Sequence, residues 1–362
     1  MLVHICCSID SHFFLQELRK LLPDEELIGY FYDPNIHPLS EYELRYFDVK
    51  RSCDKLNIKL IKGQYDYEAW LAYTKGLENE PERGKRCNKC FDFRMLNTVK
   101  LALKLRQKTF TTTLLCSPKK DLEQLKTSMQ NALNGTNLEF FCVDFRKNGG
   151  IERQLNLAKK DRLYHQNYCG CFYAFMQQKS PEIIIKELSS SVYKNLILPA
   201  SIEEKIKIFK QINKLEKQNK NYELIREKFL NYRLLYARIR SNDNVLKAVV
   251  LFYSHFKTRK IKLKLDSSKD FIFCNKDDIY IIAFNKANEY FKANDFESFY
   301  KNPPNINKQI LFRKKIFNHY SLSPIIILEK MPDNIEIIAK SIIFDDTKIR
   351  LFVTKGNNAV CI

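Results

Sequence analysis

The feature that most constrains this chain is a short apolar run at residues 2–5 that ends in two adjacent cysteines, Cys6 and Cys7. Such a run predicts a buried β-strand, and the apolar periodicity of residues 13–22 predicts a helix after it. In an open α/β sheet, ligands bind at the loop that leaves the carboxyl end of a strand. This loop carries two thiols and Asp10, which are metal ligands rather than a glycine-rich phosphate cradle.

Predicted strands and helices alternate through the rest of the first half. Strands are expected at 27–32, 58–61, 109–115 and 138–143, and helices at 41–53, 65–75, 91–108 and 121–133. This alternation predicts βαβ units, hence an α/β fold with a Rossmann-like (HUP-like) parallel sheet flanked by helices. Residues 78–90, which include Pro81 and Gly84, are expected to form a loop that delivers Cys87 and Cys90.

The composition changes after about residue 180, where serines at 189–191 and Pro199 suggest a linker. Beyond it we expect a basic helix at 202–220 that continues through 221–240, then β-rich segments at 260–265, 278–283 and 335–353. The predicted domains are therefore a catalytic domain at 1–180, a linker at 181–200 and a basic α+β accessory domain at 201–362.

Charge points to a polyanionic partner. The chain has a net charge of +19, with 28 Lys and Arg against 22 Asp and Glu in residues 1–180, and 33 against 20 in residues 181–362. Nucleic acid is the first candidate and a membrane surface the second, while a merely solvated basic surface is the alternative. No apolar run approaches the ~18 residues that span a bilayer, and no signal-peptide pattern is present, so we expect a cytoplasmic protein without membrane association.

Six of the eleven cysteines form close pairs, which argues for metal or redox chemistry rather than a disulfide framework. Cys6, Cys7, Cys87 and Cys90 supply four thiolates, enough for a [4Fe-4S] cluster or a tetrahedral zinc. Adjacent cysteines are unusual in structural zinc sites, so the spacing favours iron–sulfur. The remaining five are expected to be buried and unreactive: Cys53, Cys116, Cys142, Cys274 and Cys361.

Two smaller features have competing interpretations. Asp10 is close enough to Cys6 to share its site, but it is also a good N-cap for the following helix, which residues alone favour. Cys169 and Cys171 are too close for a zinc knuckle; with Gly170 between them they can form a strained, easily reduced disulfide, or remain two thiols in a turn.

Other polar side chains are predicted on loops at the same end of the sheet. Positive charge beside Cys87 and Cys90 suits a tRNA backbone, although a solvated basic loop is the ordinary interpretation. The loop residues expected at this end are Asp33, His37, Asp66, Glu78, Arg83, Arg86, Asp144 and Arg146, with Lys85 and Lys89 adding charge at the mouth.

The ordered motifs of residues 1–180 resemble the cobalamin-independent epoxyqueuosine reductases of the QueH type. The resemblance rests on residues 4–7, 30–38, 80–90, 112–118, 144–146 and 168–171. It does not extend to 181–362, where this chain departs from the compact members of that family.

The resemblance implies a [4Fe-4S] cluster with an adjacent metal ion, expected to be iron, and reduction of epoxyqueuosine to queuosine in a tRNA anticodon. It implies that Cys6, Cys7, Cys87 and Cys90 are cluster and metal ligands and that Asp10 ligates the extra metal. It further implies that Cys169 and Cys171 are the redox-active catalytic pair. An external electron donor is required, and tRNA carrying epoxyqueuosine is the partner. Because residues 181–362 hold most of the excess positive charge, we expect the accessory domain at 201–362 to bind this tRNA.

The reaction needs protons and a place for the substrate base. Asp33, His37 and Tyr168 are the candidate proton donors, and Tyr32, Trp70 and Tyr168 are candidates for stacking on the base. Two other functions compete. A non-catalytic zinc-binding RNA module would use the four cysteines structurally, and an ATP-dependent tRNA thiolase would need a Ser-Gly-Gly-type phosphate loop that residues 6–10 do not provide.

Overall fold

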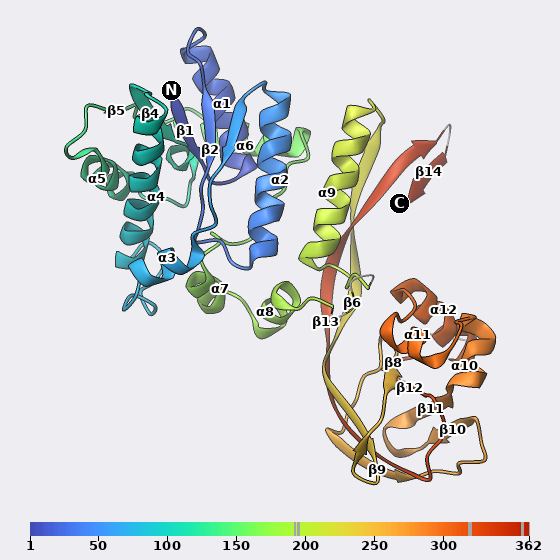
Figure 1. Cartoon of the computed structure of the whole chain (residues 1–362). Coiled ribbons are helices and arrows are strands. Elements are labelled where there is room, and N and C mark those ends of the chain that lie inside the picture. Colours follow the sequence, from blue (N-terminus) through green and yellow to red (C-terminus); the bar gives the residue numbers. More distant parts are fainter. Residues whose placement is uncertain (192, 194–195, 318–320, 356–357, 362) are drawn as a thin grey trace. The chain divides into compact units, whose positions relative to one another are not determined.

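The chain divides into two compact units, Met1–Ser180 and Pro181–Ile362 (Figure 1). The structure is a computed structural model that describes residues 1–191, 193, 196–317, 321–355 and 358–361, with only the backbone of 354, 355 and 358–361. Part of the expected linker, at 192, 194 and 195, and the side chain of Cys361 therefore lie outside the described residues. Among the described helices, none combines the length and the apolar character needed to cross a bilayer.

A five-stranded parallel sheet forms the centre of the first unit, with strand order β3-β2-β1-β4-β5. The central strands are short and buried along their whole length, as expected for a sheet covered on both faces. The bounds are β1 Leu2–Ile5, β2 Ile28–Phe31, β3 Lys59–Lys62, β4 Thr109–Thr112 and β5 Glu139–Phe140.

Helices cover both faces of this sheet. Helix α1 packs against α2 and α6, whereas α4 packs against α5 on the other side of the strands (Figure 1). Their bounds are α1 Ser8–Leu21, α2 Leu39–Lys55, α3 Tyr67–Tyr73, α4 Lys85–Lys104, the 3-10 helix η1 Thr113–Cys116, α5 Leu122–Leu133, α6 Gly150–Lys160 and α7 Phe172–Gln178. The predicted Rossmann-like parallel sheet flanked by helices is confirmed.

The strand order reverses between β1 and β4, because the chain builds β2 and β3 on one side of β1 and β4 and β5 on the other. The loops after β1 and β4 therefore diverge, which leaves a crevice at the carboxyl ends of the strands. His4 of β1 is fully buried there, with Nδ1 2.8 Å from Thr112 Oγ1 and Nε2 3.0 Å from the Tyr32 carbonyl. Burial lowers the pKa of His4 well below its usual value, so the ring is neutral and links three strand ends.

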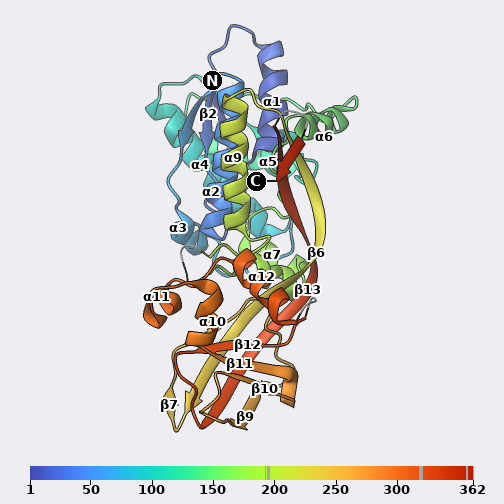
Figure 2. The ribbon, with the colours of Figure 1, turned by 90° about the vertical axis from the view of Figure 1, so that its right-hand side faces the viewer.

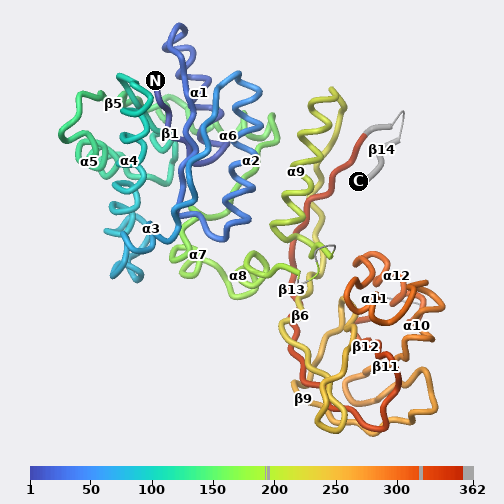
Figure 3. Tube along the Cα trace, in the orientation of Figure 1, coloured from blue at the N-terminus to red at the C-terminus, as the bar shows by residue number. Residues whose placement is uncertain are grey.

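The described residues of the second unit form two sheets and five α-helices. Figures 2 and 3 show these elements. One sheet has the order β10-β11-β12-β8; the other has the order β14-β13-β6-β7, with β9 paired to β13. Its helices are α8 Pro181–Leu188, α9 Ile202–Lys217, α10 Phe284–Phe291, α11 Phe296–Lys301 and α12 Ile306–Phe317, with the 3-10 helix η2 Lys276–Asp278. Its strands are β6 Tyr222–Ser241, β7 Asn244–Val245, β8 Ala248–Val250, β9 Lys260–Lys264, β10 Phe271–Cys274, β11 Ile279–Ala283, β12 Ile325–Leu328, β13 Asn334–Lys355 and β14 Asn358–Cys361. The predicted α+β character of this half is confirmed.

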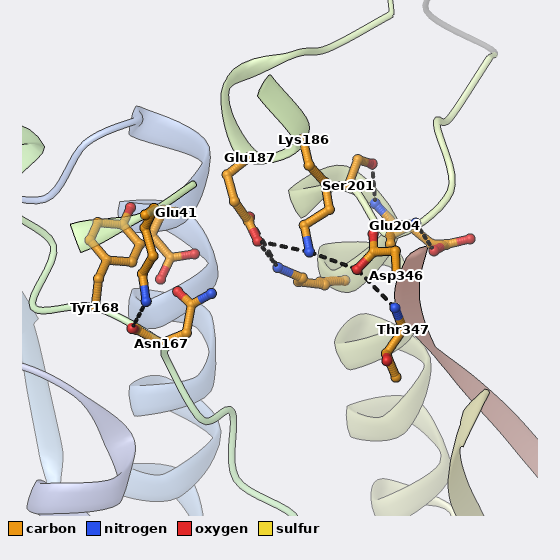
Figure 4. A network of polar contacts seen from close by, with 12 residues as sticks. Glu41, Asn167, Tyr168, Lys186, Glu187, Ser201, Glu204, Asp346 and Thr347 are labelled. Carbon is orange, nitrogen blue, oxygen red and sulfur yellow. Dashed lines mark hydrogen bonds and ion pairs between the residues drawn. The ribbon is translucent and has the colours of Figure 1, made fainter. Parts of the chain in front are cut away.

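Helix α8 occupies the first part of the segment expected to be a linker. Lys186 Nζ lies 2.9 Å from Asp346 Oδ1, and Lys205 Nζ lies 2.9 Å from Glu187 Oε1 (Figure 4). Asp346 also accepts the backbone N–H of Thr347 at 2.8 Å. These contacts join α8 to β13 and α9 within the second unit.

The expectation that residues 221–240 continue as helix is wrong, because they form the long strand β6. Its residues pair with β13 from Tyr222↔Val353 to Arg240↔Glu336, with one register shift between Lys340 and Ser341. Helical periodicity alone was a weak guide here, because Tyr, Phe, Leu and Ile are equally suited to a paired strand. Strand pairing with a segment more than 90 residues away decides the outcome, and that partner is invisible in a local window.

One substitution pair tests the strand character of β6. Ile239 is 4% exposed in a core with Ile261 and Ile337, whereas the adjacent Arg238 is exposed. Ile239→Ala should lower the free energy of unfolding of the second unit by about 2–5 kcal/mol, measured by urea denaturation. Arg238→Ala, on the opposite face of the strand, should change it by less than about 0.5 kcal/mol. Equal losses of stability in the two variants would contradict the alternation of buried and exposed side chains along β6.

Candidate metal centre

Six cysteines line one cavity of about 140 Å³ in the first unit. A single water needs only about 10–15 Å³ on the same measure, so this cavity has room for a larger group. Cys6 and Cys7 follow the carboxyl end of β1, Cys87 and Cys90 come from α4, and Cys169 and Cys171 come from the segment before α7. The structure thus brings together all three cysteine pairs singled out in the sequence.

Cys6, Cys7 and Asp10 form the tightest donor group, with ligand atoms all within 4.8 Å of one another. Cys6 Sγ lies 3.8 Å from Cys7 Sγ and 3.7 Å from Asp10 Oδ2. The N-cap interpretation of Asp10 is wrong: α1 begins at Ser8, Cys7 is the N-cap, and Asp10 lies inside the first turn. Asp10 is buried, and its Oδ1 accepts a 2.6 Å hydrogen bond from Gln154 of α6.

Cys87 and Cys90 lie on a helix, not on the expected loop, because α4 begins at Lys85. Their spacing of three residues, followed by Arg94 four residues later, places all three on one side of α4. The backbone N–H of Arg83 donates to Cys87 Sγ at 3.2 Å. The helix start also favours negative charge on Cys87, since the first-turn N–H groups have no partner within the helix.

Burial makes most of these thiols reluctant to ionise by themselves. It raises the pKa of Cys90 to about 12, that of Cys171 to about 11, and that of Cys87 above its usual value. A hydrogen bond with Cys6, together with burial, raises the pKa of Cys7. Thiolates at these positions therefore need positive charge close by.

Five Arg and Lys side chains line the same cavity: Arg45, Arg86, Arg94, Lys119 and Lys120. Arg94 makes an ion pair with the buried Asp33 carboxylate. Burial lowers the pKa of Lys120, but the neighbouring Cys169, Glu82 and Cys87 outweigh it and raise the pKa above the usual value. The cavity wall therefore carries fixed positive charge facing the sulfur atoms.

The residues present fit a metal or metal–sulfur group. The donor set is sulfur with one carboxylate, which suits zinc or an iron–sulfur centre. The three closest donors converge in a buried pocket, and the cations of the wall offset the negative charge that several thiolates would bring together.

The turn between Cys169 and Cys171 depends on Gly170. Its φ is +109°, and a Cβ at this position would lie 2.7 Å from Ile36 Cγ1. The Gly170 carbonyl accepts the backbone N–H of His37 at 2.9 Å, and Cys171 forms a β-bridge with Ile36. Only glycine satisfies both the backbone angle and the available space. Both cysteines are free thiols in the structure.

A buried polar network holds this turn against α2. Arg45 donates to the Tyr168 carbonyl at 3.0 Å and to the Cys169 carbonyl at 3.1 Å. Glu41 accepts Arg45 Nε at 2.8 Å and the Tyr164 hydroxyl at 2.9 Å. Arg45 and Glu41 are 3% and 1% exposed. The backbone at the start of the third cysteine pair, Cys169 and Cys171, is therefore positioned by a buried ion pair rather than by solvent-exposed contacts.

Of the loop residues expected at the site, Asp33 and Arg86 line the cavity. Burial raises the pKa of Asp33 to about 6 even though Arg94 opposes the shift. The other six are not among the residues that line it: His37, Asp66, Glu78, Arg83, Asp144 and Arg146. Lys85 and Lys89 are exposed and do not line it either, and Lys89 lies over the Tyr73 ring.

The aromatic and proton-donor candidates divide in the same way. Trp70 and Tyr168 line the cavity, whereas Tyr32 donates its hydroxyl to Asp66 at 2.9 Å and does not. The Tyr168 hydroxyl donates to the His37 carbonyl. The His37 ring stacks on Tyr67 instead of lining the cavity.

The isolated cysteines were expected to be buried. Cys53 and Cys116 are buried and Cys274 is partly buried, whereas Cys142 is exposed, so the prediction for Cys142 is wrong.

Arg45, Arg94, Lys120 and Gln154 are site residues that the sequence analysis missed. The signal for Arg94 was its spacing of four from Cys90, which has meaning only if the helix begins before Cys87. Arg45, Lys120 and Gln154 reach the cavity from distant segments, and no local pattern marks them.

Comparison with known proteins defines the class. A family model described as "Epoxyqueuosine reductase QueH" matches residues 1–177. A protein of Helicobacter pylori with that description is 34% identical over 96% of this chain and 99% of its own length. Proteins with the same description from Acinetobacter baylyi and Thermotoga maritima are 36% and 32% identical, over 48% and 49% of this chain and 79% and 92% of their own lengths.

The fold and the site therefore define an α/β oxidoreductase of tRNA modification with a cysteine-lined centre at the switch point of its sheet. The chain belongs to the epoxyqueuosine reductase QueH family. Members of this family carry out the reductive conversion of epoxyqueuosine. The match to the Helicobacter pylori relative extends across the second unit as well, because it covers nearly the whole chain.

A solved structure described as a predicted subunit of a tRNA methyltransferase from Methanocaldococcus jannaschii is also similar. It covers 60% of this chain and 88% of its own, at 14% identity and a TM-score of 0.30. A likeness at this level carries no argument about function.

The role of Arg45 in holding the Cys169 backbone can be tested on the native protein. Arg45→Lys keeps a charge near Glu41 but loses the forked hydrogen bonds to two carbonyls, each of which contributes about 1.5–3 kcal/mol in charged form. We expect alkylation of Cys169 by iodoacetamide, followed by mass spectrometry, to become about tenfold faster. Lys50→Met, an exposed change on the same helix, is the control. An unchanged rate in Arg45→Lys would refute the positioning role.

Proposed function

We propose that this chain reduces epoxyqueuosine to queuosine in tRNA with a [4Fe-4S] cluster, an adjacent metal ion, expected to be iron, and a redox-active cysteine pair. The proposal assigns Cys6, Cys7, Cys87 and Cys90 as ligands of the cluster and metal, and Asp10 as a ligand of the metal ion. Cys169 and Cys171 are the redox pair. We expect the enzyme to work in the cytoplasm with an external electron donor.

The convergence of three cysteine pairs on one cavity is the observation that carries this proposal. Four thiols come from the start of α1 and from α4, and a further two come from the glycine turn before α7. A structural zinc site needs only four donors. Cys169 and Cys171 are therefore in excess of a four-donor site. Arg45 holds their turn through the Tyr168 and Cys169 carbonyls, which supports a catalytic role for this pair.

The electron balance agrees with a dithiol. Removing the epoxide oxygen as water takes two electrons and two protons and leaves a carbon–carbon double bond. Cys169 and Cys171 supply two electrons and two protons when their two S–H bonds break and one S–S bond forms. An external reductant then restores the dithiol. A bound metal centre would supply Lewis acidity at the epoxide oxygen and one-electron transfer.

Asp33 is the best-placed proton donor of the three candidates. It lines the cavity, is 1% exposed, and its Oδ2 has no hydrogen-bond partner among the described residues. Burial raises its pKa to about 6, so it holds a proton at mildly acidic pH. The Arg94, Arg45 and Lys120 side chains face it and limit how far its pKa rises.

The substrate base has to leave the anticodon stack to reach a buried cavity. Trp70 Nε1 and Gln166 Oε1 are buried without a hydrogen-bond partner among the described residues, and both side chains line the cavity. These unsatisfied groups are suited to the polar edge of a flipped-out base.

The metal centre is tested by anaerobic purification with iron, zinc and sulfide analysis on one sample. We expect brown protein with about four sulfides and at least four irons per chain, lost in Cys87→Ala. Cys142→Ala changes an exposed thiol that does not line the cavity, and it should keep the full content. One zinc per chain without sulfide, even after reconstitution, would instead favour the zinc-binding RNA module.

The acid role of Asp33 predicts a pH dependence. Because the group acts in its protonated form, the conversion rate should fall as pH rises through about 6. Asp33→Asn should lower the rate about 100-fold, remove this dependence on pH and retain the iron content. His37→Gln should keep this dependence, since His37 does not line the cavity. If the fall in rate near pH 6 disappeared in His37→Gln and persisted in Asp33→Asn, His37 and not Asp33 would be the proton donor.

A further inference from the structure

One face of the second unit gathers positive charge on three neighbouring strands. Strands β9, β13 and β6 pair side by side, and their outward residues lie opposite one another in register. We call this surface the basic face, defined by Lys260, Lys262 and Lys264 of β9, Lys340 and Glu336 of β13, and Arg238 and Arg240 of β6.

The register places these side chains in rows across the sheet. Lys262 is opposite Glu336, which is opposite Arg240, and Lys340 is opposite Tyr236. The alternate residues of the same strands point into the core, where Ile261, Ile337 and Ile239 are 1%, 1% and 4% exposed. Strand geometry therefore fixes the cations on one side: those of β9 and β6 lie about 10 Å apart, on either side of β13, and those of one strand lie about 7 Å apart.

The basic face has far more positive than negative charge. Among the described residues, Glu336 is the one carboxylate in these rows, and Lys260, Lys262 and Arg240 lie 3.0, 3.7 and 3.7 Å from it. Arg240 also lies 3.6 Å from Asp243, in the turn that follows β6. No ion pair joins Lys264, Lys340 or Arg238 to an acid in the part of the chain that the structure describes. Some other cations of this unit have an acidic neighbour of their own, as Lys348 and Arg350 have in Glu227.

An aromatic ring and an aliphatic side chain accompany the charges. Tyr236 is 48% exposed beside Arg238 and Lys340, and Val245 of β7, opposite Arg240, is 58% exposed. Sheets that present cations and aromatic rings on an open face are a recurrent surface for RNA. Phosphates satisfy the unpaired cations, and the ring has a face on which a base or sugar can stack.

We propose that the basic face binds the phosphate backbone of the tRNA substrate, outside the base that reacts. This proposal rests on the proposed function for the choice of tRNA among polyanions. It assigns the second unit a role in substrate affinity: the basic face supplies sequence-independent electrostatic attraction, and the first unit supplies the chemistry.

The test compares two triple variants of the full chain. The face variant carries Lys260→Gln, Lys262→Gln and Lys264→Gln. The control variant carries Lys269→Gln, Lys286→Gln and Lys301→Gln, which remove the same charge from exposed lysines of the same unit that pair with Asp266, Glu289 and Glu297. Unmodified tRNA transcript is the probe, so binding is measured by fluorescence anisotropy independently of conversion.

We expect the face variant to bind tRNA about 10- to 100-fold more weakly near 0.15 M salt. The slope of the logarithm of its binding constant against the logarithm of salt concentration should be shallower by about two to three. The control variant should bind like the unchanged chain. In conversion assays the face variant should raise KM and leave kcat unchanged. A failure of the proposed reaction would abolish conversion in every variant and leave the difference in binding intact.

Three results would overturn the proposal. Equal weakening in both variants would mean that the effect is net charge, not this face. Unchanged binding in the face variant would place the tRNA elsewhere. Face-dependent binding to phosphatidylserine vesicles, without face-dependent tRNA binding, would identify a membrane surface as the partner instead.

Discussion

The buried ring of His4 is the interaction on which the arrangement of the site depends. It connects the end of β1 to Thr112 of β4 and to the Tyr32 carbonyl after β2, and these are the strands on either side of the point where strand order reverses. A neutral imidazole can make both contacts because one nitrogen donates while the other accepts. The three strand ends are therefore held together, and the cysteines that follow β1 leave from a fixed position.

Charge compensation is the second constraint, and it explains why the cavity has so many buried ions. Six thiols and a carboxylate near one another would repel as they ionise, and burial already opposes ionisation. Arg94, Lys120 and Arg86 supply positive charge from α4 and from the chain after β4. These cations are costly to bury without anions, so buried cations and ionised thiols in this cavity stabilise one another.

Much of the first unit could be predicted from sequence because its signals are local. Short apolar runs, each followed by a helical period, are sufficient for a parallel sheet, and cysteine spacing indicates which residues meet. The start of α4 was missed because its first turn is polar and basic, which hid the common helix face of Cys87, Cys90 and Arg94. Arg45 and Gln154 were beyond reach, because their contacts join residues more than 100 positions apart. The prediction for residues 221–240 was wrong for the same reason, because β6 pairs with the distant strand β13.

The long pairing of β6 with β13 has a consequence for biosynthesis. Tyr222 finds its partner only at Val353, so the second sheet cannot close until almost the whole chain has been made. The first unit needs nothing beyond residue 180 for its own sheet and core. At about 5–20 residues per second, the ribosome takes roughly ten seconds or more to add the remaining residues. The cysteine-lined domain can thus fold, and receive its inorganic group, while β6 still waits for its partner strand.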